Sequence, residues 1–161
     1  SHAERKAAFW NDAVFYFLQK AVDYADSRKT LKSVRERKLF LHRLMTFPLF
    51  YLQAKGTYCY KKYSFEKARE DFPETSWKVI KNATDMMNKW PYKYRANRNM
   101  AFVSDLDFRS YFFMTTKYYE YKHRLIDGIF REFDDNFGLW IQLSAELALE
   151  GWNKIEKEHT N

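Results

Sequence analysis

Apolar side chains recur along this chain at alternating steps of three and four residues, the spacing of one face of an α-helix. The longest run of this pattern has eight positions: Phe112, Thr116, Tyr119, His123, Ile126, Phe130, Phe133 and Phe137. Most of these side chains are large and apolar or aromatic, so other helices must cover the stripe they form. The pattern predicts a long central helix over about 104–136, opened by Ser104 and ended by Asn136 and Gly138.

The same spacing predicts shorter helices on both sides of the long one, over about 4–26, 31–55, 64–72, 76–90 and 139–157. Pro48 is expected to kink or restart the second, because proline donates no backbone hydrogen bond. Ser64 is expected to cap the third, after a loop over 57–63. The first helix should turn inward Ala7, Trp10, Val14, Phe17, Ala21 and Tyr24, and the last should turn inward Ile141, Ala145, Ala148, Trp152 and Ile155.

Composition supports the helical interpretation. Hydrophobic residues make up 46% of the chain and charged residues 30%, as in a folded protein. Only 4 glycines and 3 prolines occur among 161 residues, which disfavours a fold of many short strands. We therefore expect an all-α fold, a helical bundle of five or six helices around the long central one, forming a single domain over 1–161. Ser1 and His2 look like the remnant of a cloning tag, so we expect this domain to be excised from a longer protein.

Several classes of protein are disfavoured by what the chain lacks. No apolar run reaches the roughly 18 residues that a membrane span needs. The single cysteine, Cys59, excludes an internal disulfide and a multi-cysteine zinc site, and it favours a cytoplasmic location. The residue pattern indicates no metal site and no cofactor.

Charge is distributed unevenly along the chain. Positions 1–100 carry 21 Lys and Arg against 10 Asp and Glu, whereas positions 101–161 carry 7 against 11, and the two balances of +11 and −4 give the net +7. Such asymmetry predicts a basic surface for an anionic partner, either nucleic acid or an acidic protein surface, or another domain of the same chain. The candidate binding residues are Arg28, Lys29, Lys32, Arg35, Lys38, Arg43, Lys61, Lys62, Lys93, Arg95 and Arg98. The alternative is that these are ordinary solvated helix faces.

Tyrosines alternate with some of these cations. Tyr58, Tyr60 and Tyr63 flank Lys61 and Lys62, and Tyr92 and Tyr94 flank Lys93 and Arg95 in the same way. Interleaved aromatic and cationic side chains can stack bases and hold phosphates. Loop tyrosines can equally plug the ends of a bundle while their hydroxyl groups reach water.

Three short patterns raise the possibility of catalysis or ligand binding. Arg37 and His42 have the spacing found in one class of helical ribonucleases, where arginine steadies the phosphate and histidine moves the proton. Asp105 and Asp107 resemble a two-carboxylate metal site, but no glycine-rich turn precedes them, and Ser104-x-x-Asp107 also fits a helix capping box. His123 lies on the apolar stripe, where a hydrogen-bonded core histidine is favoured over a ligand.

Part of the chain resembles a known class of helical domain. The residues that carry the resemblance are Phe47-Pro48-Leu49-Phe50-Tyr51-Leu52, Lys55-Gly56, Tyr60-Lys61-Lys62, Ser64 to Phe72, and Trp77. They are similar to the helical domain that follows the catalytic core in small bacterial and archaeal nucleotidyltransferases, over about residues 47–90. The resemblance implies a helical accessory role, binding substrate or packing on a catalytic core, and it assigns no catalytic residue here.

We expect a non-catalytic helical accessory or interaction domain whose basic face meets an anionic partner. Two alternatives remain: the substrate-binding helical part of a nucleotidyltransferase, and a helical ribonuclease that uses Arg37 and His42.

Overall fold

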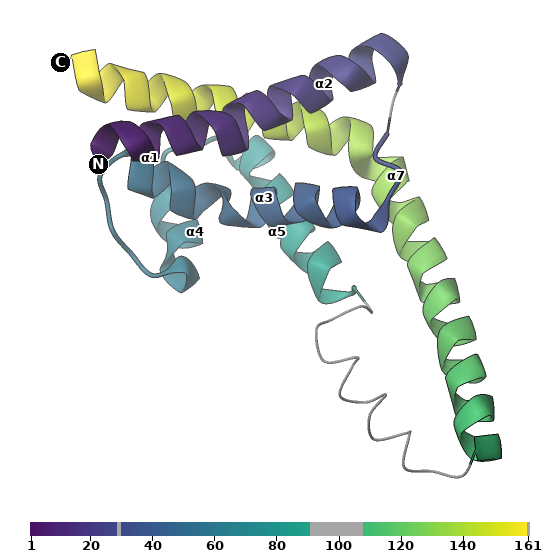
Figure 1. Cartoon of the computed structure of the whole chain (residues 1–161). Helices are drawn as coiled ribbons and strands as arrows, with labels where there is room; N and C mark the ends of the chain where they lie inside the picture. The colour runs from purple at the N-terminus through teal and green to yellow at the C-terminus, as the bar shows by residue number, and fades with distance from the viewer. Residues whose placement is uncertain (29, 91–107, 161) are drawn as a thin grey trace.

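The chain folds as an all-α helical bundle (Figure 1). The computed structural model describes residues 1–28, 30–90 and 108–160, and it describes side chains within 1–28, 30–90 and 124–158. This part of the chain contains helices and no strand. They are α1 (His2–Phe9), η1 (Trp10–Phe15), α2 (Tyr16–Ser27), α3 (Val34–Ala54), α4 (Lys61–Arg69), α5 (Glu74–Asn88) and α7 (Phe108–Thr160).

The first three elements form one continuous rod with a π-helical segment, η1, in its middle. A π-helix turns less per residue than an α-helix, so it rotates the inward face of the residues before it. Val14 and Phe17 are buried as expected, but Ala7 and Trp10 are exposed, and Phe9 and Ala13 take the inward positions. The prediction of one regular stripe along this helix was therefore wrong at its N-terminal end.

Helix α3 runs through Pro48 without interruption, so the expected restart there is wrong. Proline lacks the N–H that would bond to the carbonyl one turn earlier, and the helix accommodates this loss with Pro48 itself buried. Two residues before it, the Thr46 hydroxyl donates 2.9 Å to the carbonyl of His42. The continuous helix keeps Leu41 and Tyr51 on the same buried side of the bundle.

Helix α4 begins at Lys61 rather than at Ser64. The Ser64 side chain is buried, and its hydroxyl donates 2.8 Å to the Lys61 carbonyl instead of accepting from a backbone N–H. Ser64 is thus not the predicted cap. Tyr60 occupies the position before the helix, and the expected loop is correspondingly shorter.

Helix α7 replaces the predicted long helix and the predicted last helix with one helix of 53 residues. Gly138 lies inside it and does not end it. A β-carbon at Gly138 would stand 2.6 Å from the hydroxyl oxygen of Tyr24 on α2, so the glycine allows close packing of the two helices. In Figure 1, α7 begins away from the other helices, and its C-terminal half runs beside α2 and α1. An ion pair of 2.7 Å between Lys6 and Glu156 joins the two ends of the chain.

Aromatic rings from α2, α3 and α7 meet in the core. Phe40 is fully buried, and its ring centroid lies 5.7 Å from that of Phe17, 5.8 Å from Phe133 and 5.3 Å from Phe137. The C-terminal half of the predicted α7 stripe is therefore confirmed, with Phe130 partly buried and three members buried: Ile126, Phe133 and Phe137. The side chains of its N-terminal half, Phe112, Thr116, Tyr119 and His123, lie outside the described residues.

A helix must be both long and apolar to cross a bilayer, and no helix in the described ranges meets both conditions.

Candidate partner-binding surface

Arg37, which was suggested to steady a phosphate in a ribonuclease site, does not face solvent. Its side chain is buried at 6% exposure, and its guanidinium donates from Nη2 to both carboxylate oxygens of Asp134 on α7, each at 3.1 Å. Nη1 donates 2.8 Å to the Lys32 carbonyl, and the group lies 4.1 Å from the centre of the Phe130 ring. Arg37 therefore ties α3 to α7.

His42, the suggested partner of Arg37 in a ribonuclease site, is exposed. Helix positions five residues apart differ by about 140° around the axis. Because the Arg37 guanidinium is held against α7, the two side chains do not converge on one site in the described structure.

Arg43 also has a structural contact. Its Nη1 donates 2.8 Å to the backbone carbonyl of Asp12 in η1 and 3.3 Å to the Asp12 carboxylate. The guanidinium lies 4.4 Å from the centre of the Tyr16 ring. Burial raises the pKa of Tyr16 to about 12, although the charge of Arg43 opposes this shift and that of Glu36 adds to it. Arg43 thus holds α3 against the π-helical segment.

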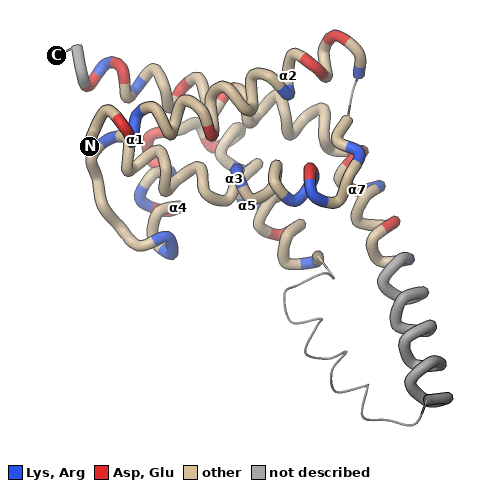
Figure 2. Tube along the Cα trace, in the orientation of Figure 1, with Lys and Arg blue, Asp and Glu red and all other residues tan. Residues whose placement is uncertain are grey.

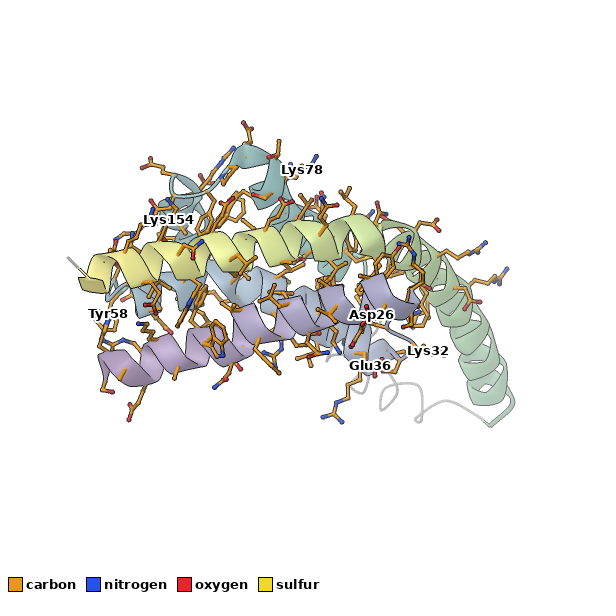
Figure 3. The ribbon with its side chains drawn as sticks, turned by 90° about the horizontal axis from the view of Figure 1, so that it is seen from above. Asp26, Lys32, Glu36, Tyr58, Lys78 and Lys154 are labelled. Atoms are coloured by element: carbon orange, nitrogen blue, oxygen red, sulfur yellow. The ribbon has the colours of Figure 1, made fainter. Side chains whose placement is uncertain are left out.

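The turn from α2 into α3 carries the remaining basic residues of the predicted face. Arg28, Lys32 and Arg35 are exposed there, while Lys38 is partly buried, 5.8 Å from the centre of the Trp90 ring. Acidic side chains share this region, since the Glu36 carboxylate accepts a 3.1 Å hydrogen bond from the Lys32 backbone N–H (labelled in Figure 3). Several other candidates lie outside the described residues: Lys29, Lys93, Arg95, Arg98, Asp105 and Asp107.

A more accessible set of cations lies at the start of α4, where Lys61 and Lys62 are exposed (Figure 2). Neither of them forms an ion pair with any residue that the structure describes. The tyrosines around them are unusually open, with exposed fractions of 71% for Tyr58, 81% for Tyr60 and 57% for Tyr63. Large aromatic side chains this exposed are uncommon unless a partner covers them.

Beside Lys61 lies an apolar pocket of about 250 Å³ between α3, α4 and α5. Its lining residues are Met45, Lys61, Ser64, Phe65, Ile80, Lys81 and Thr84. The Ser64 and Thr84 hydroxyls donate to carbonyls of their own helices, so the walls offer few free polar groups. Lys61 and Lys81 are the two charged residues of the lining, and no ion pair neutralises Lys81 among the described side chains. We call Tyr58, Tyr60, Lys61, Lys62, Tyr63, Lys81 and this pocket the α4–α5 surface.

Lys81 was not among the binding residues predicted from the sequence. The sequence marks Lys81 only as a lysine on the polar side of the α5 helix, next to the buried Ile80, which is a weak indication of a binding residue. Only the packing of α4 against α5 shows that Lys81 shares a pocket with Lys61.

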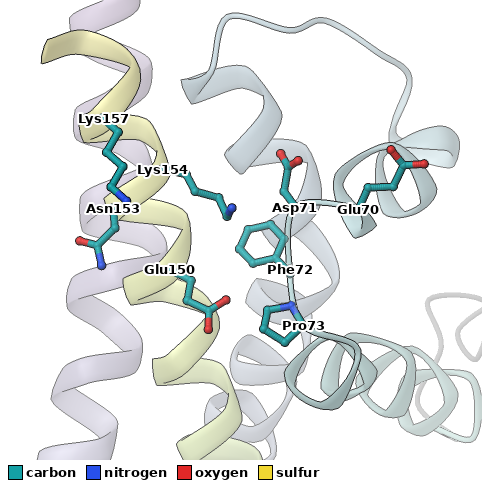
Figure 4. A pocket seen from close by; sticks show the side chains of 8 residues that line it. All are labelled: Glu70, Asp71, Phe72, Pro73, Glu150, Asn153, Lys154 and Lys157. Carbon is teal, nitrogen blue, oxygen red and sulfur yellow. The ribbon is translucent and has the colours of Figure 1, made fainter. Parts of the chain in front are cut away.

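A second pocket, of about 510 Å³, lies between the α4–α5 turn and the C-terminal half of α7 (Figure 4). It is lined by Glu70, Asp71, Phe72, Pro73, Glu150, Asn153, Lys154 and Lys157. Behind it, the buried Tyr51 hydroxyl donates 2.8 Å to Asp71, and Lys55 donates 3.0 Å to the same oxygen. Lys55 also pairs with Glu158 at 3.2 Å, which links this network to α7.

Two of the three carboxyl groups that line this second pocket, those of Asp71 and Glu150, have opposite pKa shifts. Burial tends to raise the pKa of Asp71, but hydrogen bonds from Lys55 and Tyr51 and the charges of Lys55 and Lys154 outweigh it, so the pKa lies below its ordinary 3.8. Burial and the nearby charge of Glu146 raise the pKa of Glu150, against the opposing charge of Lys154. Asp71 is therefore a structural anion that joins α3 to the α4–α5 turn.

Replacing Asp71 by asparagine is expected to remove an acid-sensitive part of the stability. A carboxyl group whose folded pKa is lowered stabilises the fold above its ordinary pKa and loses this effect as the pH falls through the folded value. Asp71→Asn should thus be less stable than the wild type at neutral pH, and the difference should shrink below about pH 4. Urea unfolding across this pH range measures it.

Glu70→Gln is the matched control, because it removes the adjacent exposed carboxylate, and it should keep the wild-type profile. A constant stability difference between Asp71→Asn and the wild type at every pH would contradict the lowered pKa.

Comparisons of the chain with protein-family models, with curated proteins and with solved structures return no match. Within the described ranges, no group of three or more His, Cys, Asp or Glu side chains is placed to hold a metal ion.

Proposed function

We propose that this chain is a non-catalytic helical interaction module that binds an acidic segment of a partner protein at the α4–α5 surface. The observation that carries the proposal is the apolar pocket lined by Lys61 and Lys81. An apolar anchor side chain in such a pocket gains hydrophobic free energy, while carboxylates beside it meet the two ammonium groups.

The chemistry of the pocket favours a peptide over a purely electrostatic partner. Met45, Phe65 and Ile80 form its apolar lining, and a phosphate backbone has no apolar group that could pack against them. A volume of about 250 Å³ accommodates one large apolar side chain and part of its neighbours. An acidic segment with a single apolar anchor side chain, whether it is helical or extended, presents this combination of groups.

The other charged regions support the proposal less well. Arg37 and Arg43 contact Asp134 and Asp12, so neither guanidinium is free for a partner. The pocket beside Asp71 combines three acidic residues with two lysines and offers no consistent charge to an anion.

Single-stranded nucleic acid is the second candidate, and the exposed Tyr58, Tyr60 and Tyr63 favour it. Aromatic rings stack bases, and the neighbouring Lys61 and Lys62 could neutralise phosphates. Residues 47–90, which resemble the helical domain of nucleotidyltransferases, also span the end of α3 together with α4 and α5. A substrate-binding role in such an enzyme would use the same surface.

Reversing the charge of Lys61 and Lys81 together is expected to weaken binding of an acidic peptide by at least about tenfold, a loss typical of removing complementary charges. The probe is a fluorescent synthetic peptide of glutamates with one central phenylalanine, titrated by anisotropy. Lys61→Glu/Lys81→Glu tests the surface. Arg35→Glu/Lys32→Glu makes the same change in net charge at the α2–α3 turn and should bind like the wild type.

A second peptide, with glycine in place of the phenylalanine, tests the pocket and should bind more weakly. Equal loss of binding in both double variants would reduce the interaction to net charge and overturn the proposal. An oligonucleotide that binds more tightly than the peptide, with steep salt dependence and a requirement for Tyr60 and Tyr63, would establish the nucleic-acid alternative.

A further inference from the structure

The outer faces of α2 and α7 form a shallow apolar groove of about 380 Å³. Four small residues, Ala21, Ala25, Gly138 and Ala145, lie in its lining, which also includes Tyr24, Arg28, Ile141, Gln142, Glu146 and Leu149. Small side chains on two adjacent helices leave room for another helix to approach closely, because the distance between helix axes is set by the side chains at the contact.

The helices that form the groove also carry exposed apolar side chains, on η1, α2 and α7. Phe15 is 56% exposed, Val22 52% and Leu139 52%, and Leu149, at the groove itself, is 44% exposed. Of these, Leu149 lines the groove itself, and an exposed large apolar side chain in an apolar groove is a feature of interaction sites. Figure 3 shows α2 and the C-terminal half of α7 side by side.

The two ends of the groove carry opposite charges, from Arg28 and Glu146. The rod of η1 and α2 runs antiparallel to α7, since Trp10 of η1 contacts Trp152 and Tyr24 of α2 contacts Phe137. Arg28 therefore lies at the end of the groove near Gly138. Glu146 lies eight positions further along α7, or about 12 Å at the rise of an α-helix.

Both charged groups are available to a partner. The Arg28 guanidinium lies 5.3 Å from the centre of the Tyr24 ring, and Glu146 accepts a 3.4 Å hydrogen bond from Gln142. Neither forms an ion pair with any described residue. A groove with one cation at one end and one anion at the other is complementary to a copy of itself turned by a two-fold axis.

We propose that a second copy of this chain packs on the α2–α7 groove through a two-fold axis. Arg28 of each copy then meets Glu146 of the other, and Val22 and Leu149 fill the space above the alanines and Gly138 of the opposite groove. This interface shares no residue with the α4–α5 surface, so it leaves that surface open in both copies.

The two-fold arrangement makes a specific prediction for charge reversal. Arg28→Glu places two anions together at each end of the interface, and Glu146→Arg places two cations there, so each single variant should weaken dimerisation about tenfold or more. The double variant Arg28→Glu/Glu146→Arg restores opposite charges at both ends and should dimerise like the wild type. Sedimentation equilibrium over a wide range of protein concentration measures all four proteins.

Two further variants complete the experiment. Arg35→Glu reverses an exposed charge on α3 outside the groove and should leave the dimer unchanged. Ala145→Trp fills the groove and should give a monomer, with circular dichroism showing that the helices remain. A wild type that stays monomeric at every concentration, or a double variant as weak as the single variants, would overturn the proposed interface.

Discussion

Replacing Phe40 by alanine is expected to lower the free energy of unfolding by about 3–5 kcal/mol, the usual cost of removing a buried phenylalanine ring. Phe40 is fully buried at the junction of α2, α3 and α7. Its ring centroid lies within 6 Å of three others, from Phe17, Phe133 and Phe137, and 6.5 Å from Tyr16. Removing the ring leaves a cavity whose walls come from three helices, so no single side-chain movement can close it.

Leu39→Ala is the matched control for this prediction. Leu39 precedes Phe40 on the same helix but is 42% exposed, so its removal opens no cavity and should cost less than about 1 kcal/mol. Urea unfolding of both variants measures the difference. Similar losses for the two would show that Phe40 is not at the centre of the core.

Replacing Asp134 by alanine is expected to cost about 2–3 kcal/mol, because it leaves the Arg37 guanidinium buried without its counter-ion. Arg37 is 6% exposed, and two of its nitrogens donate to Asp134. Without the Asp134 carboxylate, the Lys32 carbonyl is the hydrogen-bond acceptor left to the Arg37 guanidinium among the described residues. The expected loss of unfolding free energy is smaller than for a fully buried ion pair, since the Asp134 side chain is 39% exposed to solvent.

The physical cause can be isolated with a second substitution. In Arg37→Met/Asp134→Ala the buried charge is gone and an apolar chain lies against Phe130, so most of the lost stability should return. Asp135→Ala removes the adjacent exposed carboxylate and should be near neutral. If the double variant were as unstable as Asp134→Ala alone, an unpaired buried charge would not be the cause.

These two sites show what the residue pattern could and could not predict. The period of three and four residues correctly placed Phe133 and Phe137 on a buried stripe, because helix geometry alone determines which positions share a face. The same pattern could not predict the ion pair that the buried Arg37 forms. Its partner Asp134 is 97 positions away in the chain, and only the packing of α3 on α7 brings the two together.

Gly138 and the first helix illustrate two other limits. A glycine after a periodic stretch is the usual sign of a helix end, but here it reflects the approach of Tyr24, which the local sequence does not reveal. The π-helical segment from Trp10 to Phe15 shifts the buried face, and a stripe drawn at regular helical spacing then assigns Trp10 to the wrong side.

The candidate surface was predicted in part. Lys61 and Lys62 were among the candidate binding residues, and the tyrosines around them were expected either to stack bases or to plug the ends of the bundle. The structure leaves those tyrosines open to solvent. The apolar pocket and the contribution of Lys81 depend on how α4 packs against α5. Tertiary packing also redistributed the basic residues of α3, of which Arg37 and Arg43 stabilise helix contacts.

Chemical-shift mapping of the ¹⁵N-labelled chain with the glutamate–phenylalanine peptide tests most directly whether the α4–α5 surface binds an acidic partner. We expect saturable shifts of backbone amides around the pocket, at Lys61, Phe65 and Lys81, and weaker shifts when the phenylalanine is replaced by glycine. Shifts confined to Arg28, Lys32 and Arg35 at the α2–α3 turn, or no saturable shift at any amide, would contradict the proposed function.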